Sequence, residues 1–428
     1  MGMYDESLRA FLKPVLGYLD DDRCSEILIN GPEDVWIEMS GQLYKTDVVF
    51  TEDGLSAAAR NMAQFVGRTL SEDRPRLDAR MPDGSRIHVI LPPVARCGTT
   101  ISIRKFFPGG LTIDQLVQFG SITPEAASLV EACVLIAKNI VVAGGTGSGK
   151  TTLLNVISQF IPNEERIITI EDSAELQLSQ DHLVPLESRP ADIKGKGEVS
   201  IRDLLHSSLR LRPDRIVIGE VRGGECFDLL QALNTGHGGS MTTTHANSPR
   251  ETLTRLESLA LLSGVELPLR AVRAQVAAAI DVVVCCSRFV DGSRKITHIS
   301  EVLPLDQRGD YQVQDLFVYT QTGRDEEGKV QGYLAPTGVL PTFLDKLVAN
   351  GFVEFDKYYF NAATYGLEPP PMFTGKALVG VAAGDSGDGG DGCGPKIPGD
   401  REISEVGVFA SEFDDEDFGP EDTKPGQG

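Results

Sequence analysis

The sequence predicts an α/β protein in which a small α+β domain comes first, a doubly wound and mainly parallel sheet follows, and an acidic tail ends the chain. Three observations support this prediction. A glycine-rich loop separates an apolar strand from an apolar helical pattern at residues 139–152, strand and helix patterns alternate onward to about residue 302, and the composition changes near residue 373. Alternating strands and helices are typical of a parallel sheet with helices on both faces.

These changes of pattern divide the chain into five segments. We expect an α+β domain at residues 1–108, a linker at 109–122, the α/β domain at 123–305, a docked extension at 306–372 and a disordered tail at 373–428. The tail has thirteen acidic and four basic residues, and it cannot bury enough apolar area to offset the entropy lost on folding. The tail could keep the protein soluble or dock on a partner, and its composition favours the first role.

Composition narrows the class of protein. The 428 residues carry a net charge of −22, which disfavours broad nucleic-acid binding because that needs a basic surface. No apolar run approaches a membrane span, and the first residues lack the features of a signal peptide. The seven cysteines are scattered without a Cys-x-x-Cys pair, which disfavours a zinc site and fits a reducing cytoplasm.

The first domain is predicted from strands and turns. Strands at 24–30 and 35–39 surround a Gly-Pro turn, a strand at 43–50 follows, and a helix covers 55–70. A hairpin of 77–81 and 86–91 turns at Pro82-Asp83-Gly84-Ser85, and a strand at 99–106 completes the domain. Several arginines gather here, including Arg80, Arg86 and Arg104. By themselves they fit an exposed basic face and a phosphate-binding role equally well.

The second domain begins with helices at 113–119 and after Thr123, which is a predicted N-cap followed by Pro124. Further strands are expected at 166–171, 215–219, 239–244 and 280–286, and the last pairs with 294–302 across Asp291-Gly292. Helices are expected between them, one of them starting at a capping box of Ser200 and Asp203.

The glycine-rich loop predicts a site for a nucleoside triphosphate. An apolar strand at 140–143 runs into Gly144-Gly145-Thr146-Gly147-Ser148-Gly149-Lys150-Thr151-Thr152, and an apolar helical pattern follows. Glycines allow backbone N–H groups to surround a polyphosphate at the start of a helix. Lys150 is expected to contact the β- and γ-phosphates, and the Thr151 hydroxyl is expected to bind Mg²⁺.

Hydrolysis needs further groups near the γ-phosphate. The strand at 215–219 ends next to Glu220, which we expect to orient or deprotonate the attacking water; Gly219 stands where many ATPases have Asp. Glu171 and Asp172 end another strand, at the edge where parallel sheets bind ligands. His237 and His245 flank a short polar strand and are expected to sense the γ-phosphate or orient Glu220.

In this combination and order, the sequence resembles the secretion ATPases of type II and type IV systems. The segments Leu211–Glu225 and Asn234–Asn247 resemble most the CpaF/TadA branch, the ATPases of tight-adherence (Flp) pilus assembly. The likeness is strong from about Asp20 to Val302, weaker to about residue 360 and absent in the tail. The four-cysteine zinc insert of many type II assembly ATPases is missing.

The resemblance implies a RecA-like ATPase domain and a homo-hexameric ring that is cytoplasmic and peripheral to the inner membrane, where it drives platform proteins. ATP with Mg²⁺ would bind between the two domains, and Arg80, Arg86 and Arg104 match family arginines that approach the γ-phosphate on closure. Three alternatives stay open: a type IV secretion or conjugation ATPase, a nucleotide-binding scaffold without turnover, and a helicase. The acidic charge disfavours the helicase.

Overall fold

The computed structural model describes residues 9–39, 41–81, 83–106, 110–191 and 196–370. The tail predicted at 373–428 lies outside the described residues, as does residue 109 at the start of the predicted linker.

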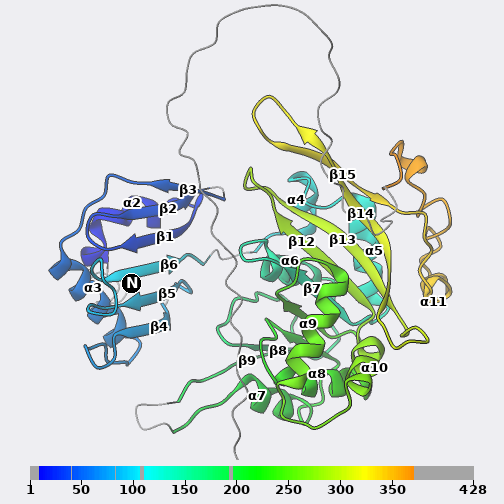
Figure 1. The fold of residues 1–428 in the computed structure, drawn as a ribbon, viewed down its shortest axis with the longest axis horizontal. Helices are drawn as coiled ribbons and strands as arrows, with labels where there is room; N and C mark the ends of the chain where they lie inside the picture. Colours follow the sequence, from blue (N-terminus) through cyan, green and yellow to red (C-terminus); the bar gives the residue numbers. More distant parts are fainter. Residues whose placement is uncertain (1–8, 40, 82, 107–109, 192–195, 371–428) are drawn as a thin grey trace, which may run out of the picture. The chain divides into compact units, whose positions relative to one another are not determined.

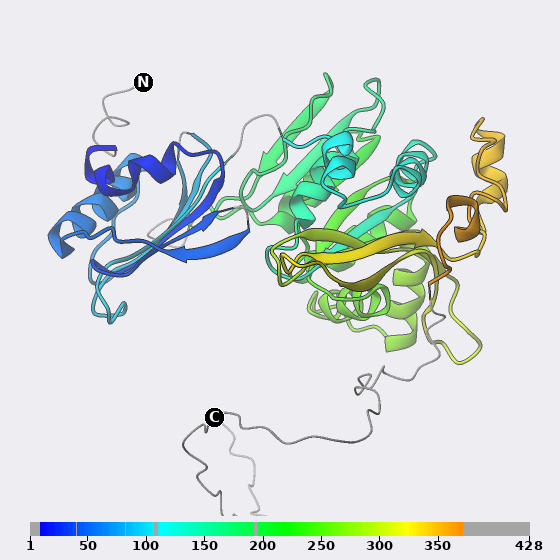
Figure 2. The same ribbon diagram turned by 90° about the horizontal axis from the view of Figure 1, so that it is seen from above.

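The first domain is an antiparallel sheet covered by one long helix (Figures 1 and 2). After two short helical turns, η1 (Lys13–Val15) and α2 (Leu16–Leu19), the sheet has the order β3-β2-β1-β6-β5-β4. Its strands are β1 (Cys24–Asn30), β2 (Val35–Met39), β3 (Gln42–Lys45), β4 (Arg76–Arg80), β5 (Arg86–Ile90) and β6 (Thr100–Arg104).

Helix α3 (Glu52–Phe65) supplies the other half of this domain's core. Its buried Leu55, Ala58 and Met62 share one apolar cluster with residues of the strands. The helix begins three residues before the predicted position because Thr51 caps it, with the Thr51 hydroxyl accepting a bond from the Gly54 N–H at 3.1 Å. The prediction of an α+β domain is confirmed.

The second domain is built on a nine-stranded sheet with the order β15-β14-β13-β12-β7-β11-β10-β8-β9. The strands from β12 to β9 pair in parallel, and β13, β14 and β15 continue the sheet antiparallel from β12. The bounds of the strands are β7 (Ile140–Gly144), β8 (Ile167–Glu171), β9 (Leu183–Glu187), β10 (Arg215–Ile218), β11 (Met241–Thr244), β12 (Val282–Arg288), β13 (Arg294–Leu303), β14 (Gln312–Arg324) and β15 (Val330–Pro336).

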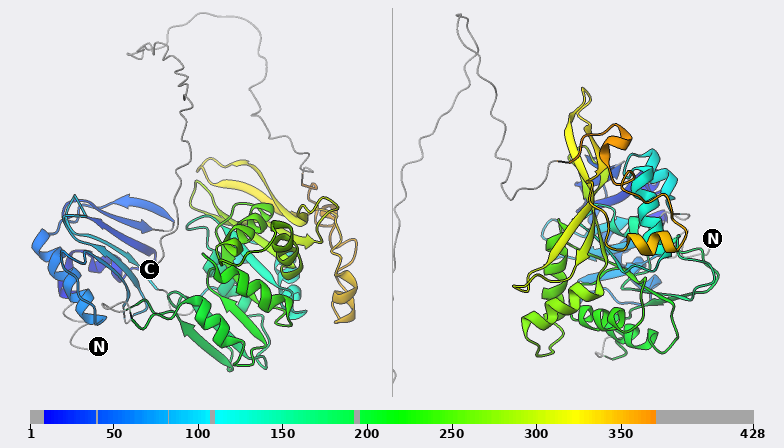
Figure 3. Two further views of the ribbon diagram at one scale, coloured as in Figure 1. Left: turned by 60° about the horizontal axis from the view of Figure 1, so that its bottom comes forward. Right: turned by 90° about the vertical axis from the view of Figure 1, so that its right-hand side faces the viewer.

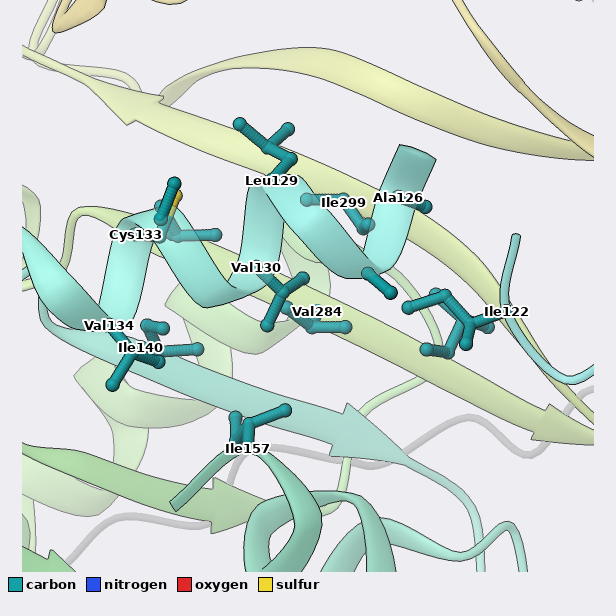
Figure 4. Close-up of a cluster of buried hydrophobic side chains, with 14 of the residues drawn as sticks. Ile122, Ala126, Leu129, Val130, Cys133, Val134, Ile140, Ile157, Val284 and Ile299 are labelled. Atoms are coloured by element: carbon teal, nitrogen blue, oxygen red, sulfur yellow. The ribbon is translucent and has the colours of Figure 1, made fainter. Parts of the chain in front are cut away.

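Helices cover both faces of this sheet (Figure 3). One face carries α4 (Ile113–Gln118), α5 (Pro124–Leu135) and α6 (Lys150–Ser158). Helix α11 (Leu344–Ala349) adds Leu347 to the apolar cluster of this face, and Tyr365 of η2 (Ala362–Tyr365) packs on Tyr359 beside it. Figure 4 shows Val130 of α5 directed toward Val284 of β12, and Leu129 and Cys133 of α5 belong to the same apolar cluster. The other face carries α7 (Ile201–Ser208), α8 (Glu225–Asn234), α9 (Pro249–Leu261) and α10 (Leu269–Ala279).

The central parallel strands β7, β8, β10 and β11 are buried along their length, as expected for a sheet covered on both sides. The predicted caps are also present: Thr123 accepts from the Ala126 N–H, and Ser200 and Asp203 form the capping box of α7. Strand β9 was not predicted, because it is a half-exposed edge strand with Pro185 inside it and shows no clear apolar alternation.

A candidate nucleotide site with a carboxylate base

The glycine-rich loop takes the conformation that its glycines permit. Gly147 and Gly149 have φ of +69° and +93°, in the left-handed region that favours glycine. A Cβ on Gly144 would lie 2.4 Å from both the Ser148 hydroxyl and the Cys286 carbonyl oxygen, so the strand end has no room for a side chain. Helix α6 begins at Lys150 and no side chain caps it. The start of α6 therefore suits an anionic ligand.

Lys150 is largely buried, and its ammonium is held by groups of the protein. It donates to the Gly145 carbonyl oxygen at 2.9 Å and lies 3.4 Å from His245 Nδ1. Burial lowers the pKa of Lys150. Because a lysine ammonium can only donate, His245 Nδ1 must accept. The ring proton of neutral His245 then lies on Nε2.

Glu220 accepts a hydrogen bond from the Nε2–H of His245 and also forms an ion pair with Arg222. Its Oε1 lies 3.0 Å from His245 Nε2, and its Oε2 lies 2.6 Å from Arg222 Nη2. Burial, followed by the charge of Lys150, lowers the pKa of His245, which favours the neutral ring in this arrangement. Lys150, His245 and Glu220 thus form one continuous line of contacts.

The order of the strands explains this line. In the sheet order β7-β11-β10-β8, Lys150 follows β7 at the start of α6, His245 follows β11, Glu220 follows β10, and Asp172 follows β8. All four strands are parallel, so their carboxyl ends meet at one edge, where α/β sheets bind ligands.

Glu171 fills the space beside Gly219. A Cβ on Gly219 would lie 3.1 Å from Glu171 Cγ, and the Glu171 side chain is almost fully buried. Glu171 Oε1 accepts bonds from the Glu175 and Leu176 N–H groups at 2.8 and 3.0 Å. Burial raises the pKa of Glu171 to about 7. Gly219, which follows β10, has no side chain, and the carboxyl group beside it belongs to Glu171 at the end of β8.

These groups line a cavity of about 810 Å³, a volume typical of small-molecule sites. The loop residues Thr146 to Thr152 lie along it, together with Glu171, Asp172, Glu220 and His245. The lining also includes Arg86 and Arg104 of the first domain. Arg86 Nη1 pairs with Glu175 Oε1 at 2.5 Å, and Arg104 Nε pairs with Glu26 Oε1 at 2.6 Å.

Four predicted site residues are not among the described residues that line the cavity: Gly144 and Gly145 of the loop, and Arg80 and His237. Arg80 donates to the Gly84 carbonyl oxygen at 3.4 Å and stacks on the Phe106 ring. His237 precedes β11 while His245 follows it, so a strand of about 13 Å separates them. The structure brings His245, and not His237, to Glu220.

Several cavity residues were not predicted from the sequence. Arg222 lies in the motif after Glu220, so its position gave a usable signal. Arg294 gave none: it donates to the Gly147 carbonyl oxygen at 2.9 Å and lies 3.5 Å from Glu38 of the first domain, which also pairs with Arg288 at 3.0 Å.

Thr151 is the predicted ligand of a divalent cation. It is partly buried in the first turn of α6 and lines the cavity. Across the described ranges, no group of three or more His, Cys, Asp and Glu side chains is arranged to hold a metal ion.

Comparisons with known proteins identify the family of this chain. The family model described as "Type II/IV secretion system protein" matches residues 10–327. A putative conjugal transfer protein of Mycobacterium tuberculosis is 39% identical over 289 residues, covering 66% of this chain and 82% of that protein. The type IV secretion system protein VirB11 of Brucella suis is 35% identical over 326 residues, covering 69% and 90%.

A solved structure supports the fold separately. The ATPase DotB of Legionella pneumophila matches with a TM-score of 0.50 at 20% identity, over 70% of this chain and 82% of that chain. The chain belongs to the type II/IV secretion system protein family and is an ATPase of that family.

Proposed function

We propose that this chain hydrolyses ATP as the motor of a type IV secretion or conjugation machine. The observation that carries the hydrolytic part is the line of contacts from Lys150 through His245 to Glu220 beside the glycine-rich loop. A protein that only binds a nucleotide needs the loop and the lysine, but it has no need for a carboxylate held within reach of the γ-phosphate.

Each group has a role in this proposal. The loop from Gly144 to Thr152 binds the phosphates, and Lys150 exchanges the Gly145 carbonyl oxygen for phosphate oxygens. Glu220 accepts a proton from the attacking water, and Arg86 and Arg104 neutralise charge on the γ-phosphate when the domains close. Bound through Thr151, Mg²⁺ would supply positive charge to the phosphate oxygens.

The relatives favour a secretion or conjugation role over pilus assembly. The names of the Mycobacterium tuberculosis and Brucella suis relatives refer to conjugal transfer and to type IV secretion. A second candidate, the ATPase of tight-adherence (Flp) pilus assembly in the CpaF/TadA branch, is favoured by the segments Leu211–Glu225 and Asn234–Asn247.

We further propose that the chain works as a homo-hexamer on the cytoplasmic side of the inner membrane, bound to platform proteins. Within the described part of the chain, no helix is long and apolar enough to cross a membrane. Attachment would then rest on contacts with membrane proteins.

Steady-state release of phosphate from Mg²⁺-ATP by the purified full chain tests the hydrolytic function. We expect release by the native chain and none above background by Lys150→Ala. Nucleotide binding without release by the native chain, at any ring-forming concentration, would instead identify a scaffold.

A gene deletion separates the two machines. Loss of protein or DNA transfer with surface pili retained supports the secretion motor, whereas loss of pili with transfer retained supports the Flp motor. Complementation with the Lys150→Ala gene is the control, because it restores the protein without its turnover.

A further inference from the structure

The guanidinium of Arg222 joins two carboxylates from neighbouring strand ends. Arg222 Nη2 lies 2.6 Å from Glu220 Oε2, and Arg222 Nη1 lies 2.8 Å from Asp172 Oδ2. Glu220 follows β10 and Asp172 follows β8, so one side chain connects the two strand ends at the edge that borders the cavity.

The backbone of Arg222 is fixed on both sides. Val221 is buried, and its N–H donates to the Thr243 carbonyl oxygen of β11 at 3.0 Å. The N–H groups of Arg222 and Gly223 both donate to Glu225 Oε1, at 2.7 and 2.8 Å. The Arg222 side chain itself is 56% exposed. Its place is therefore set by a rigid backbone and by its two ion pairs, with little help from packing.

These contacts restrict the Glu220 carboxylate. Arg222 binds its Oε2 and His245 binds its Oε1, and the Glu220 side chain is only 14% exposed. A carboxylate has about four acceptor positions, so two contacts fix its plane and still leave lone pairs for a water molecule. A general base needs this combination of fixed orientation and a free acceptor position.

We infer that Arg222 is a positioning residue for ATP hydrolysis: by bridging Asp172 and Glu220 it holds the Glu220 carboxylate in the orientation that activates water. This inference rests on the proposed function of Glu220 as the base. The bridge requires the planar fork of arginine, because two nitrogen atoms of one rigid group contact two different carboxylates. A lysine ammonium would keep the charge without this geometry.

The test compares Arg222→Gln and Arg222→Lys in the full chain. For Arg222→Gln we expect kcat to fall about 100-fold, the order of loss caused by misplacing a catalytic group by about 1 Å. The affinity for a non-hydrolysable ATP analogue with Mg²⁺ should stay within about twofold of the native value, because Arg222 acts on Glu220 and not on the nucleotide. Arg222→Lys should recover part of the loss.

The double variant Arg222→Gln/Glu220→Gln distinguishes a positioning role of Arg222 from a general loss of folding. If Arg222 acts through Glu220, then adding Arg222→Gln to Glu220→Gln should not lower the residual rate further. Arg202→Gln is the matched control, because Arg202 is also partly exposed and pairs with Asp228 at 2.6 Å, and neither residue lines the cavity among the described residues.

Three results would overturn the inference: an unchanged kcat in Arg222→Gln, a loss of nucleotide affinity as large as the loss of kcat, or a further fall in the Glu220→Gln background. If Arg222→Gln does not fold, Asp172→Asn removes the other anchor of the bridge and should also lower kcat while nucleotide affinity is kept. Absence of phosphate release by the native chain would contradict the proposed function instead.

Discussion

The two domains present different walls to the cavity. On the α/β side, Lys150 is 8% exposed and the side chain of Glu220 is 14% exposed, and His245, whose side chain is 44% exposed, contacts both of them. On the side of the first domain, the Arg104 side chain is 54% exposed and pairs with Glu26. An exposed pair of this kind contributes only about 0–1 kcal/mol. Arg104 can therefore exchange its carboxylate partner for a phosphate at little cost, whereas the α/β wall is already organised.

This difference indicates how the work is divided. The α/β domain holds Lys150, His245 and Glu220 in one line of contacts. The first domain contributes Arg104, whose exposed ion pair with Glu26 is weak, and Arg86, whose more buried ion pair joins Glu175 of the α/β domain. We therefore describe the α/β wall as the fixed wall and the wall of the first domain as the adjustable wall.

The largest expected effect is the loss of kcat when His245 of the fixed wall is replaced. His245→Ala should lower kcat by about 10²–10³-fold, because the base loses the group that orients it. His237→Ala is the control and should leave kcat within about threefold, because its ring bonds the Ala232 carbonyl oxygen outside the cavity lining given by the described residues. Equal losses in the two variants, measured by phosphate release, would contradict the separation of the histidines.

The next effect concerns Glu171 and pH. Its pKa is raised from 4.5 to about 7 by burial, so between these values the folded chain holds a proton that the unfolded chain has released. The stability associated with this proton is fully present below pH 4.5 and is lost as pH rises through about 7, on the order of 3 kcal/mol in total. Glu171→Gln should remove that slope. Urea denaturation of both proteins from pH 5 to 8 measures it, and parallel curves would refute the assignment.

The adjustable wall is tested with two arginines. Arg104→Ala should lower kcat about tenfold, the value of one charge-assisted hydrogen bond. Arg80→Ala should change kcat less than twofold, because Arg80 stacks on Phe106 and bonds Gly84. Phosphate release at saturating ATP distinguishes them, and a larger loss in Arg80→Ala would reverse the assignment.

The smallest expected effect lies outside the cavity. Thr51 caps α3 in the first domain and Thr123 caps α5 in the second. Alanine at either position should lower the free energy of unfolding by about 1 kcal/mol and leave kcat within about twofold. Thermal denaturation with parallel rate assays checks this. A large loss of kcat in one variant would show that this domain transmits local damage to the cavity.

Much of the fold and part of the site could be predicted from the sequence. Residues placed by the ends of parallel strands, such as Glu220 and His245, follow from strand order because all the carboxyl ends share one edge. The same rule explains His237: a residue before a strand lies at the opposite edge from a residue after it, so the two histidines could not both approach Glu220.

The remaining site residues depend on long-range pairing. Arg222 with Asp172, and Arg86 with Glu175, are joined across 50 and 89 residues of sequence. Arg294 contacts Gly147 across 147 residues. No local period or motif specifies such pairs, because their geometry depends on how the strands and domains pack.

The central claim is that Glu220 acts as the base within a fixed wall that binds ATP without its help. The most direct measurement mixes the full-length Glu220→Gln chain with Mg²⁺-ATP, isolates the complex and identifies the bound nucleotide. We predict ATP bound with near-native affinity and a turnover at least about 100-fold below the native rate. Bound ADP with native turnover would contradict it.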